Sequence, residues 1–204
     1  MNVGVLALQG AFAEMEAYWR TRGAEVFEIR QSADLERGID LLALPGGEST
    51  VQGRLLKKLG LFEPLKRRID AGLPVFATCA GLILLAERIE NDDAVWFASL
   101  PVTVKRNAYG RQLGSFTTRG AYDGSPDITM TFIRAPAITA VGEGVKILSS
   151  FDGRPTAVRW RNITALAWHP ELTPPFPSIR PEAPSCAACR PCGGQGGAGA
   201  AGAW

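Results

Sequence analysis

The sequence predicts an α/β protein with a doubly wound, mostly parallel sheet, helices on both faces and added antiparallel strands. Two observations lead to this fold class. In roughly the first 90 residues, short apolar runs alternate with helical stretches, which is the pattern of βαβ units. In the second half, strand-like runs follow one another and turn signals separate them, which is typical of antiparallel pairing.

The parallel half begins with "NVGVLAL", an apolar run typical of a strand buried on both faces. The helical stretch "AFAEMEAYWRTRG" follows and stops at Gly23, a suitable C-cap. "AEVFEIR" and "IDLLALPGG" predict the second and third strands, and residues 48–72 predict one or two helices with a break near Gly60. "LPVFATC" predicts the fourth strand, and residues 80–89, "AGLILLAERI", predict the helix after it.

The pattern changes near Asn91. From there the sequence predicts mostly strands, in residues 96–107, 128–141, 145–160 and 162–171. Turn signals separate several of them, at Tyr109-Gly110, Asp123-Gly124 and Asp152-Gly153. We expect this half to add antiparallel strands to one side of the sheet and then to return to the core.

Composition limits the classes of function. The hydrophobic fraction of 46% and charged fraction of 21% are ordinary for a globular protein, and a net charge of +2 argues against nucleic acid as a partner. No apolar run approaches the roughly 18 residues of a membrane span, and the N-terminus lacks the basic region of a signal peptide. We therefore expect a cytoplasmic protein, without disulfides.

The chain divides into residues 1–173 and a Pro/Gly/Ala-rich tail, residues 174–204, which we expect to be disordered or ordered only by packing on neighbours. Three of the four cysteines, Cys186, Cys189 and Cys192, lie in this tail. Their spacing is compatible with a zinc or iron–sulfur site, but a fourth protein ligand is not evident. We expect no metal and no cofactor.

Cys79 stands between a predicted strand and a predicted helix in "VFATCAGLILL". This is the pattern of a nucleophile elbow, and Ala80 and Gly81 leave room for the tight turn. The N–H groups at the helix start would favour the thiolate, and that of Ala80 could donate to an oxyanion. The alternative is a small buried thiol, a common fate of free cysteine.

The single histidine, His169, directly follows the apolar run "ITALAW", and Glu171 comes two residues later. A lone histidine is more often structural, and a lone glutamate more often solvated. At the end of a core strand, however, the pair could act as the base and the orienting carboxylate for Cys79.

"LPGGES" also follows a predicted strand, and Gly46 and Gly47 would allow close backbone approach to a ligand. By itself the motif is compatible with an ordinary turn. Because ligands bind at the carboxyl edge of open α/β sheets, the turns at Gln9-Gly10, Gly46-Gly47 and Cys79 are expected to converge there.

"PGGES", "TCAGLILLA" and "HPE", in this order and spacing, resemble the triad class of glutamine amidotransferase domains. "LALQGAF", "LPGGEST", "KRNAYGRQ", "FIRAP" and "WHPELT" are similar to one branch, the glutaminase subunits of pyridoxal 5'-phosphate synthase. The likeness covers residues 3–173, and its specificity lies in the combination of motifs.

The resemblance implies that Cys79 attacks the side-chain amide of L-glutamine, while His169, oriented by Glu171, protonates the leaving ammonia and later activates water. It implies an oxyanion hole from Gly47 and Ala80, with Gln9 and Gly46 in supporting places. The family's substrate contacts carry over to Gly47, Glu48, Ser49, Arg106, Ile133 and Arg134. An arginine suits the substrate carboxylate and a glutamate its ammonium, but the sequence leaves open which group does which.

The resemblance further implies a partner, a (β/α)8-barrel synthase subunit that receives the ammonia and makes pyridoxal 5'-phosphate. One departure stands out. Where the family continues into a closing helix after "HPELT", this chain has its Pro/Gly/Ala-rich tail, and one hypothesis is a frameshift or an altered terminus that replaced the helix. Two alternatives stay open: another elbow-cysteine hydrolase such as a peptidase or deglycase, and a non-catalytic or docking-defective regulatory subunit of the same fold.

Overall fold

The computed structural model describes residues 1–90, 92–108 and 115–173. Its main sheet has seven strands in the described part of the chain, in the order β10-β11-β12-β4-β3-β1-β2. Neighbours among β12, β4, β3, β1 and β2 pair in parallel, whereas β10, β11 and β12 pair antiparallel. The bounds are β1 Asn2–Leu6, β2 Glu25–Ile29, β3 Leu41–Leu44, β4 Val75–Thr78, β10 Lys146–Phe151, β11 Arg154–Trp160 and β12 Ile163–Leu166.

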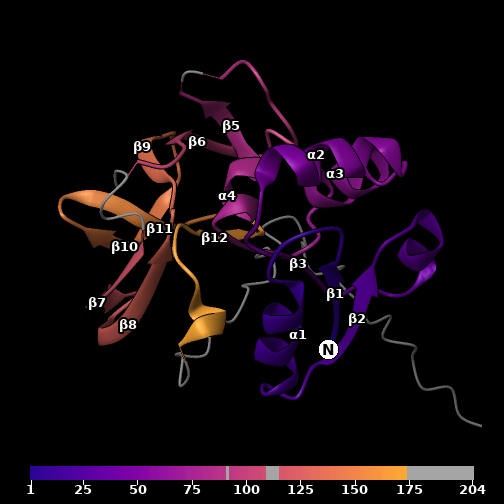
Figure 1. Cartoon of the computed structure of the whole chain (residues 1–204), viewed down its shortest axis with the longest axis horizontal. Helices are drawn as coiled ribbons and strands as arrows, with labels where there is room; N and C mark the ends of the chain where they lie inside the picture. The colour runs from indigo at the N-terminus through magenta and orange to yellow at the C-terminus, as the bar shows by residue number, and fades with distance from the viewer. Residues whose placement is uncertain (91, 109–114, 174–204) are drawn as a thin grey trace, which may run out of the picture.

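Helices cover both faces of this sheet (Figure 1). Helix α1 (Phe12–Arg20) lies on one face, and α2 (Ser49–Lys58), α3 (Phe62–Asp70) and α4 (Ala80–Leu85) lie on the other. A short 3-10 helix, η1 (Ser32–Glu36), connects β2 to β3. The fold class predicted from the sequence is confirmed, and α2 and α3 are separated near Gly60 as expected.

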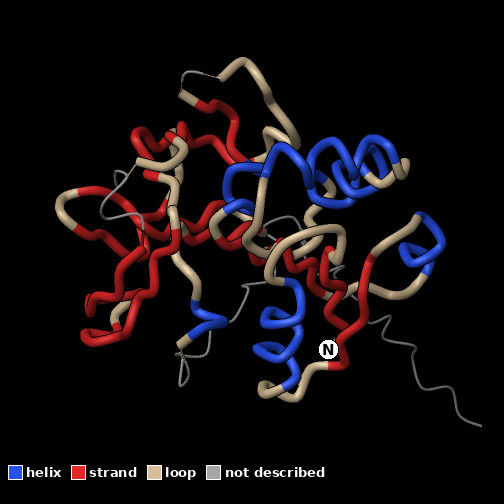
Figure 2. Tube along the Cα trace, in the orientation of Figure 1, coloured by secondary structure: helices blue, strands red, loops and turns tan. Residues whose placement is uncertain are grey.

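The added strands gather at one side of the molecule (Figure 2). Strands β5 (Ala86–Ile89), β6 (Leu100–Lys105) and β9 (Ala137–Val141) form a three-stranded sheet, and β7 (Ser115–Tyr122) and β8 (Ser125–Ile133) form a hairpin. The turns expected at Asp123-Gly124 and Asp152-Gly153 join β7 to β8 and β10 to β11. The turn expected at Tyr109-Gly110 lies outside the described residues, as do the tail and its three cysteines.

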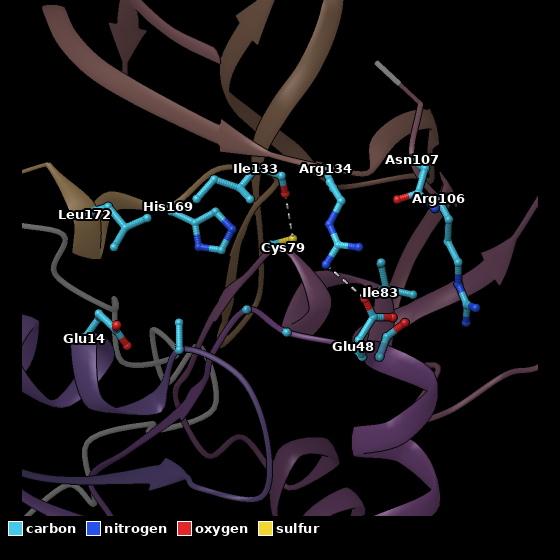
Figure 3. Close-up of a pocket in the computed structure, with 14 residues that line it drawn as sticks. Glu14, Glu48, Cys79, Ile83, Arg106, Asn107, Ile133, Arg134, His169 and Leu172 are labelled. Carbon is cyan, nitrogen blue, oxygen red and sulfur yellow. Dashed lines mark hydrogen bonds and ion pairs between the residues drawn. The ribbon is translucent and has the colours of Figure 1, made fainter. Parts of the chain in front are cut away.

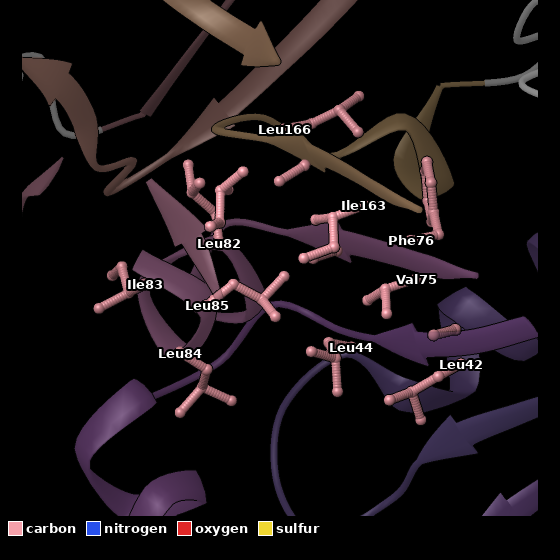
Figure 4. Close-up of a cluster of buried hydrophobic side chains, with 14 of the residues drawn as sticks. Leu42, Leu44, Val75, Phe76, Leu82, Ile83, Leu84, Leu85, Ile163 and Leu166 are labelled. Carbon is pink, nitrogen blue, oxygen red and sulfur yellow. The ribbon is translucent and has the colours of Figure 1, made fainter. Parts of the chain in front are cut away.

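The core explains why the parallel strands appear in the sequence as continuous apolar runs. All four residues of β3, of β4 and of β12 are buried, because helices or neighbouring elements cover both faces of these strands. Helix α4 is buried all round, and its leucines pack against the three central strands (Figure 4). This packing holds the start of α4, and hence Cys79, against the sheet.

The predicted helix over residues 80–89 is wrong in its second half. Helix α4 ends at Leu85, and the chain turns into strand β5 at Ala86. Ala86 pairs with Leu100, and Ile89 with Val104 of β6. Ala, Glu and Arg favour a helix locally, but the hydrogen bonds and burial offered by β6 override that preference.

The turns after β1 and β3 meet at the carboxyl edge of the sheet, as expected. Gly10 has φ +98°, and a Cβ there would lie 2.0 Å from the carbonyl oxygen of Gly46. The N–H of Ala11 donates to that same oxygen at 2.9 Å. Only glycine fits at position 10, because both the backbone conformation and the contact exclude a side chain.

Candidate active site

A cavity of about 370 Å³ opens at this edge, within the roughly 300–1,000 Å³ range of small-molecule sites. Cys79 lies near its centre, with His169 on one side and Arg134 on the other (Figure 3). Nine of the residues singled out in the sequence line it: Gly46, Gly47, Glu48, Ser49, Cys79, Arg106, Ile133, Arg134 and His169.

Cys79 occupies a strained turn between β4 and α4. Its backbone has φ 47° and ψ −99°, an uncommon conformation for a residue with a side chain. A Cβ at Gly81 would lie 2.3 Å from the carbonyl oxygen of Leu44, so the turn fits only because this neighbour is glycine. The Cys79 residue is 7% exposed, and its Sγ lies 3.9 Å from the carbonyl oxygen of Ile133. The elbow geometry predicted from the sequence is present.

His169 follows β12 and stands at the N-cap of the short 3-10 helix η2 (Pro170–Leu172). Its N–H donates to the carbonyl of Thr131 at 2.8 Å, which ties this segment to β8. The imidazole Nδ1 lies 2.7 Å from Oε1 of Glu171, and that oxygen also accepts a hydrogen bond from Thr78 at 3.3 Å. The Glu171 side chain is fully buried behind the imidazole, so it holds the ring orientation rather than facing the cavity.

The two groups beside His169 govern its charge. Burial lowers the pKa of His169, but hydrogen bonds to Cys79 and Glu171 and the charges on both groups outweigh burial and raise it to about 10. At neutral pH the imidazolium form is therefore favoured. An imidazolium next to the sulfur atom can hold the thiol proton while the thiolate attacks as a nucleophile. The same imidazolium can then donate that proton as a general acid.

Glutamines organise the glycine turn. Gln9 Oε1 accepts the N–H of Glu48 at 2.7 Å. Gln52, which is fully buried in α2, donates from Nε2 to the carbonyl of Gln9 at 2.9 Å and to that of Pro45 at 3.3 Å. These bonds join the turn after β1 to the turn after β3. The sequence predicted a supporting place for Gln9, but no motif or spacing indicated a role for Gln52.

The end of the cavity away from His169 is rich in charge (Figure 3). Arg134 Nη2 pairs with Glu48 Oε1 at 3.2 Å, and both side chains are more than half exposed. Arg134 has φ 45°, which directs the chain sharply after β8. Arg106 lines the same end, where its Nη1 contacts Asp92 Oδ2 at 3.0 Å. Opposite charges at one end of a cavity suit a zwitterionic ligand.

Three of the predicted residues do not line the cavity. Glu171 lies behind His169, Gln9 lies under the glycine turn, and Ala80 is fully buried at the start of α4. Five lining residues were not predicted: Ala11, Glu14, Ile83, Asn107 and Leu172. All but Glu14 lay within motifs quoted from the sequence: Ala11 in "LALQGAF", Ile83 in "TCAGLILLA", Asn107 in "KRNAYGRQ" and Leu172 in "WHPELT". Glu14 comes to the cavity because α1 packs beside η2.

No group of three or more His, Cys, Asp or Glu side chains with the geometry of a metal site occurs among residues 1–90, 92–108 and 115–173. Within these same residues no helix is long and apolar enough to cross a membrane.

The chain is similar to known proteins over most of its length. A protein of Desulfitobacterium hafniense strain Y51, named pyridoxal 5'-phosphate synthase subunit PdxT, is 56% identical over 172 residues, which cover 84% of this chain and 86% of the relative. A protein of the same name from Methanocorpusculum labreanum is 52% identical, and the match covers 84% of this chain and 90% of the relative.

Solved structures extend the comparison. A crystal structure of a glutamine amidotransferase matches with a TM-score of 0.80 and 39% identity over 84% of this chain and 91% of that one. A second glutamine amidotransferase, from Thermotoga maritima, is only 13% identical but shares the fold, with a TM-score of 0.57 over 84% of this chain and 76% of that one. The model of the SNO glutamine amidotransferase family matches residues 5–176. By family, sequence and fold, this chain is an enzyme of the SNO glutamine amidotransferase family.

Proposed function

We propose that this chain is the glutaminase subunit of a pyridoxal 5'-phosphate synthase and that it hydrolyses L-glutamine through Cys79, His169 and Glu171. The observation that carries the proposal is the strained elbow of Cys79 beside an imidazole whose Nδ1 lies 2.7 Å from the buried carboxylate of Glu171. The names of the relatives support the pathway, because the two proteins compared above are both called subunits of this synthase.

In the proposed reaction, the proton of the Cys79 thiol resides on His169, and the thiolate attacks the side-chain amide carbon of glutamine. The resulting oxyanion is stabilised by N–H groups of Gly47 and Ala80. His169 gives its proton to the amide nitrogen, the carbon–nitrogen bond breaks, and ammonia leaves a thioester. Neutral His169 then takes a proton from water, the hydroxide attacks the thioester, and glutamate is released from the restored thiolate.

The proposed substrate orientation follows from charge. The arginines Arg106 and Arg134 would receive the α-carboxylate, and Glu48 would receive the α-ammonium. The amide would then reach Cys79, with Ser49 and Ile133 beside it. In this orientation glutamine replaces the exposed ion pair between Arg134 and Glu48. Such a pair is worth about 1 kcal/mol or less, so its exchange is a small obstacle to binding.

The ammonia would pass to a partner synthase subunit, a (β/α)8 barrel, rather than to solvent. Residues 1–173 would form the glutamine amidotransferase domain, and residues 174–204 a separate tail.

Ammonia release from L-glutamine by the purified chain, with and without the synthase subunit of the Desulfitobacterium hafniense relative, tests the proposal. We expect turnover with the partner that is lost in the variant Cys79→Ala. A folded chain that gives no turnover in either condition would contradict the proposal and favour a docking-defective or non-catalytic subunit. Turnover of a peptide or a glycated amine instead of glutamine would favour another elbow-cysteine hydrolase.

A further inference from the structure

Arg106 is held from two sides by residues that do not line the cavity. Its Nη1 donates to Thr50 Oγ1 at 2.9 Å and lies 3.0 Å from Asp92 Oδ2. Thr50 belongs to α2, Asp92 follows β5, and Arg106 itself directly follows β6. Three segments that are distant in the sequence therefore meet at one guanidinium, at the charged end of the cavity (Figure 3).

Asp92 is itself fixed before any ligand binds. Its Oδ1 accepts the N–H of Ala94 at 2.9 Å, and its backbone forms an antiparallel bridge with Ile89. One carboxylate oxygen thus binds its own loop, and the other faces Arg106. A carboxylate used in this way has few other orientations.

The loop that carries Asp92 is anchored on α2. A Cβ at Gly53 would lie 2.3 Å from Cε3 of Trp96, so the indole ring packs directly on the helix backbone. The N–H of Phe97 donates to the carbonyl of Leu84 at 2.9 Å. Gly53 is three residues after Thr50 on α2, so one face of this helix anchors both the loop and Arg106.

Arg106 and Asp92 are partly buried, and this limits the orientations that their side chains can adopt. The side chains of Arg106 and Asp92 are 27% and 32% exposed, and Nε and Nη2 of Arg106 are buried without a partner among the described residues. A partly desolvated guanidinium is stabilised by a nearby carboxylate. An arginine side chain that is already ordered also loses less conformational freedom when it binds a carboxylate ligand.

We propose that Asp92 is a positioning residue: it holds Arg106, with the help of Thr50, in the orientation that binds the α-carboxylate of L-glutamine. This inference rests on the proposed function. It adds that substrate affinity depends on a residue outside the cavity, through one ion pair, while the chemistry at Cys79 does not depend on it.

The test compares Asp92→Asn with Asp93→Asn, a matched control that removes the same charge from the exposed neighbour. Binding of L-glutamine is measured by calorimetry in the Cys79→Ala background, so that turnover is not needed. We expect Asp92→Asn to weaken binding about five- to tenfold, and Asp93→Asn to change it less than about twofold.

In the active enzyme with its synthase partner, the KM of Asp92→Asn for L-glutamine should rise by the same factor while kcat stays within about twofold. Unfolding temperatures of both variants verify that they fold.

A double-variant comparison shows whether Asp92 acts through Arg106. In an Arg106→Ala background, Asp92→Asn should cause no further loss of kcat/KM, because the residue that it positions is gone. Thr50→Val removes the other contact to Nη1 of Arg106. It should also raise the KM for L-glutamine.

Three results would overturn this inference but not the proposed function. The first is an affinity for glutamine in Asp92→Asn that equals or exceeds that of its parent, and the second is an equal loss of affinity in Asp93→Asn. The third is a loss of kcat/KM from Asp92→Asn that persists in the Arg106→Ala background. A parent chain that does not bind glutamine at all would instead contradict the proposed function as well.

Discussion

Gly46 and His169 are in direct contact across the site: a Cβ on residue 46 would lie 2.3 Å from Cε1 of the imidazole. The glycine turn after β3 thus forms one wall against which the imidazole rests. Together with the Glu171 carboxylate on Nδ1, this wall leaves the ring little freedom to rotate.

Gly46→Ala should reduce glutaminase activity by about 100-fold or more while the protein stays folded, because the added methyl group displaces the imidazole and a small misplacement of a catalytic group is costly. Steady-state kinetics with the synthase partner and a thermal melt check this. Gly38→Ala is the matched control, since a Cβ there meets nothing closer than 4.0 Å. Normal activity in Gly46→Ala would show that the ring is not confined by this wall.

Glu171→Gln should lower kcat by about 100-fold or more, because an amide can hold the ring in the wrong tautomer and no longer stabilises the imidazolium. The KM for glutamine should change little, since Glu171 does not line the cavity. Kinetics measured on the complex test this split. A variant that raises KM and keeps kcat would contradict the role that we propose for Glu171.

The stability of the folded chain should fall as the pH rises from about 8.5 to 10. The pKa of His169 is about 10 in the folded state and near 6.5 when unfolded. Because the proposed ion pair takes its proton from Cys79, the folded chain holds an extra proton only where an unfolded thiol, with an ordinary pKa of about 8.5, is also deprotonated. From there the stabilisation is lost progressively until the folded pKa of His169 is passed.

Urea unfolding at a series of pH values measures this slope for the wild type and for His169→Asn. The variant should lose most of the slope between about pH 8.5 and 10. Identical slopes in the two proteins would show that another group accounts for the dependence, or that the imidazolium is not stabilised in the fold.

The local sequence was enough to predict the parts of the site that lie close together along the chain. Cys79 stands between a short apolar run and a helical run, and the turn between them needs small neighbours, so the elbow is visible in a single short stretch of sequence. His169 and Glu171 are two residues apart at the end of a strand, and that spacing is sufficient for the contact between them. The glycine pair after β3 could be interpreted as a close-approach turn for the same reason.

Other features had no local signal. Residues 86–89 have helix-favouring side chains, but β6 offers them strand pairing, and only the folded chain brings β6 alongside. Asp92 is an ordinary acidic loop residue in the sequence, and its importance comes from the anchoring of its loop on Gly53. Glu14 reaches the cavity because α1 packs against η2.

Local patterns were therefore enough to predict the fold class, the elbow and the order of the motifs, because periodicity, turn residues and motif spacing are local properties of the chain. Only the assembled fold sets which of these motifs share a cavity, which residues support them from behind, and how far the imidazole pKa rises. These depend on burial and on distances between segments far apart in the chain, and those quantities exist only once the sheet has assembled.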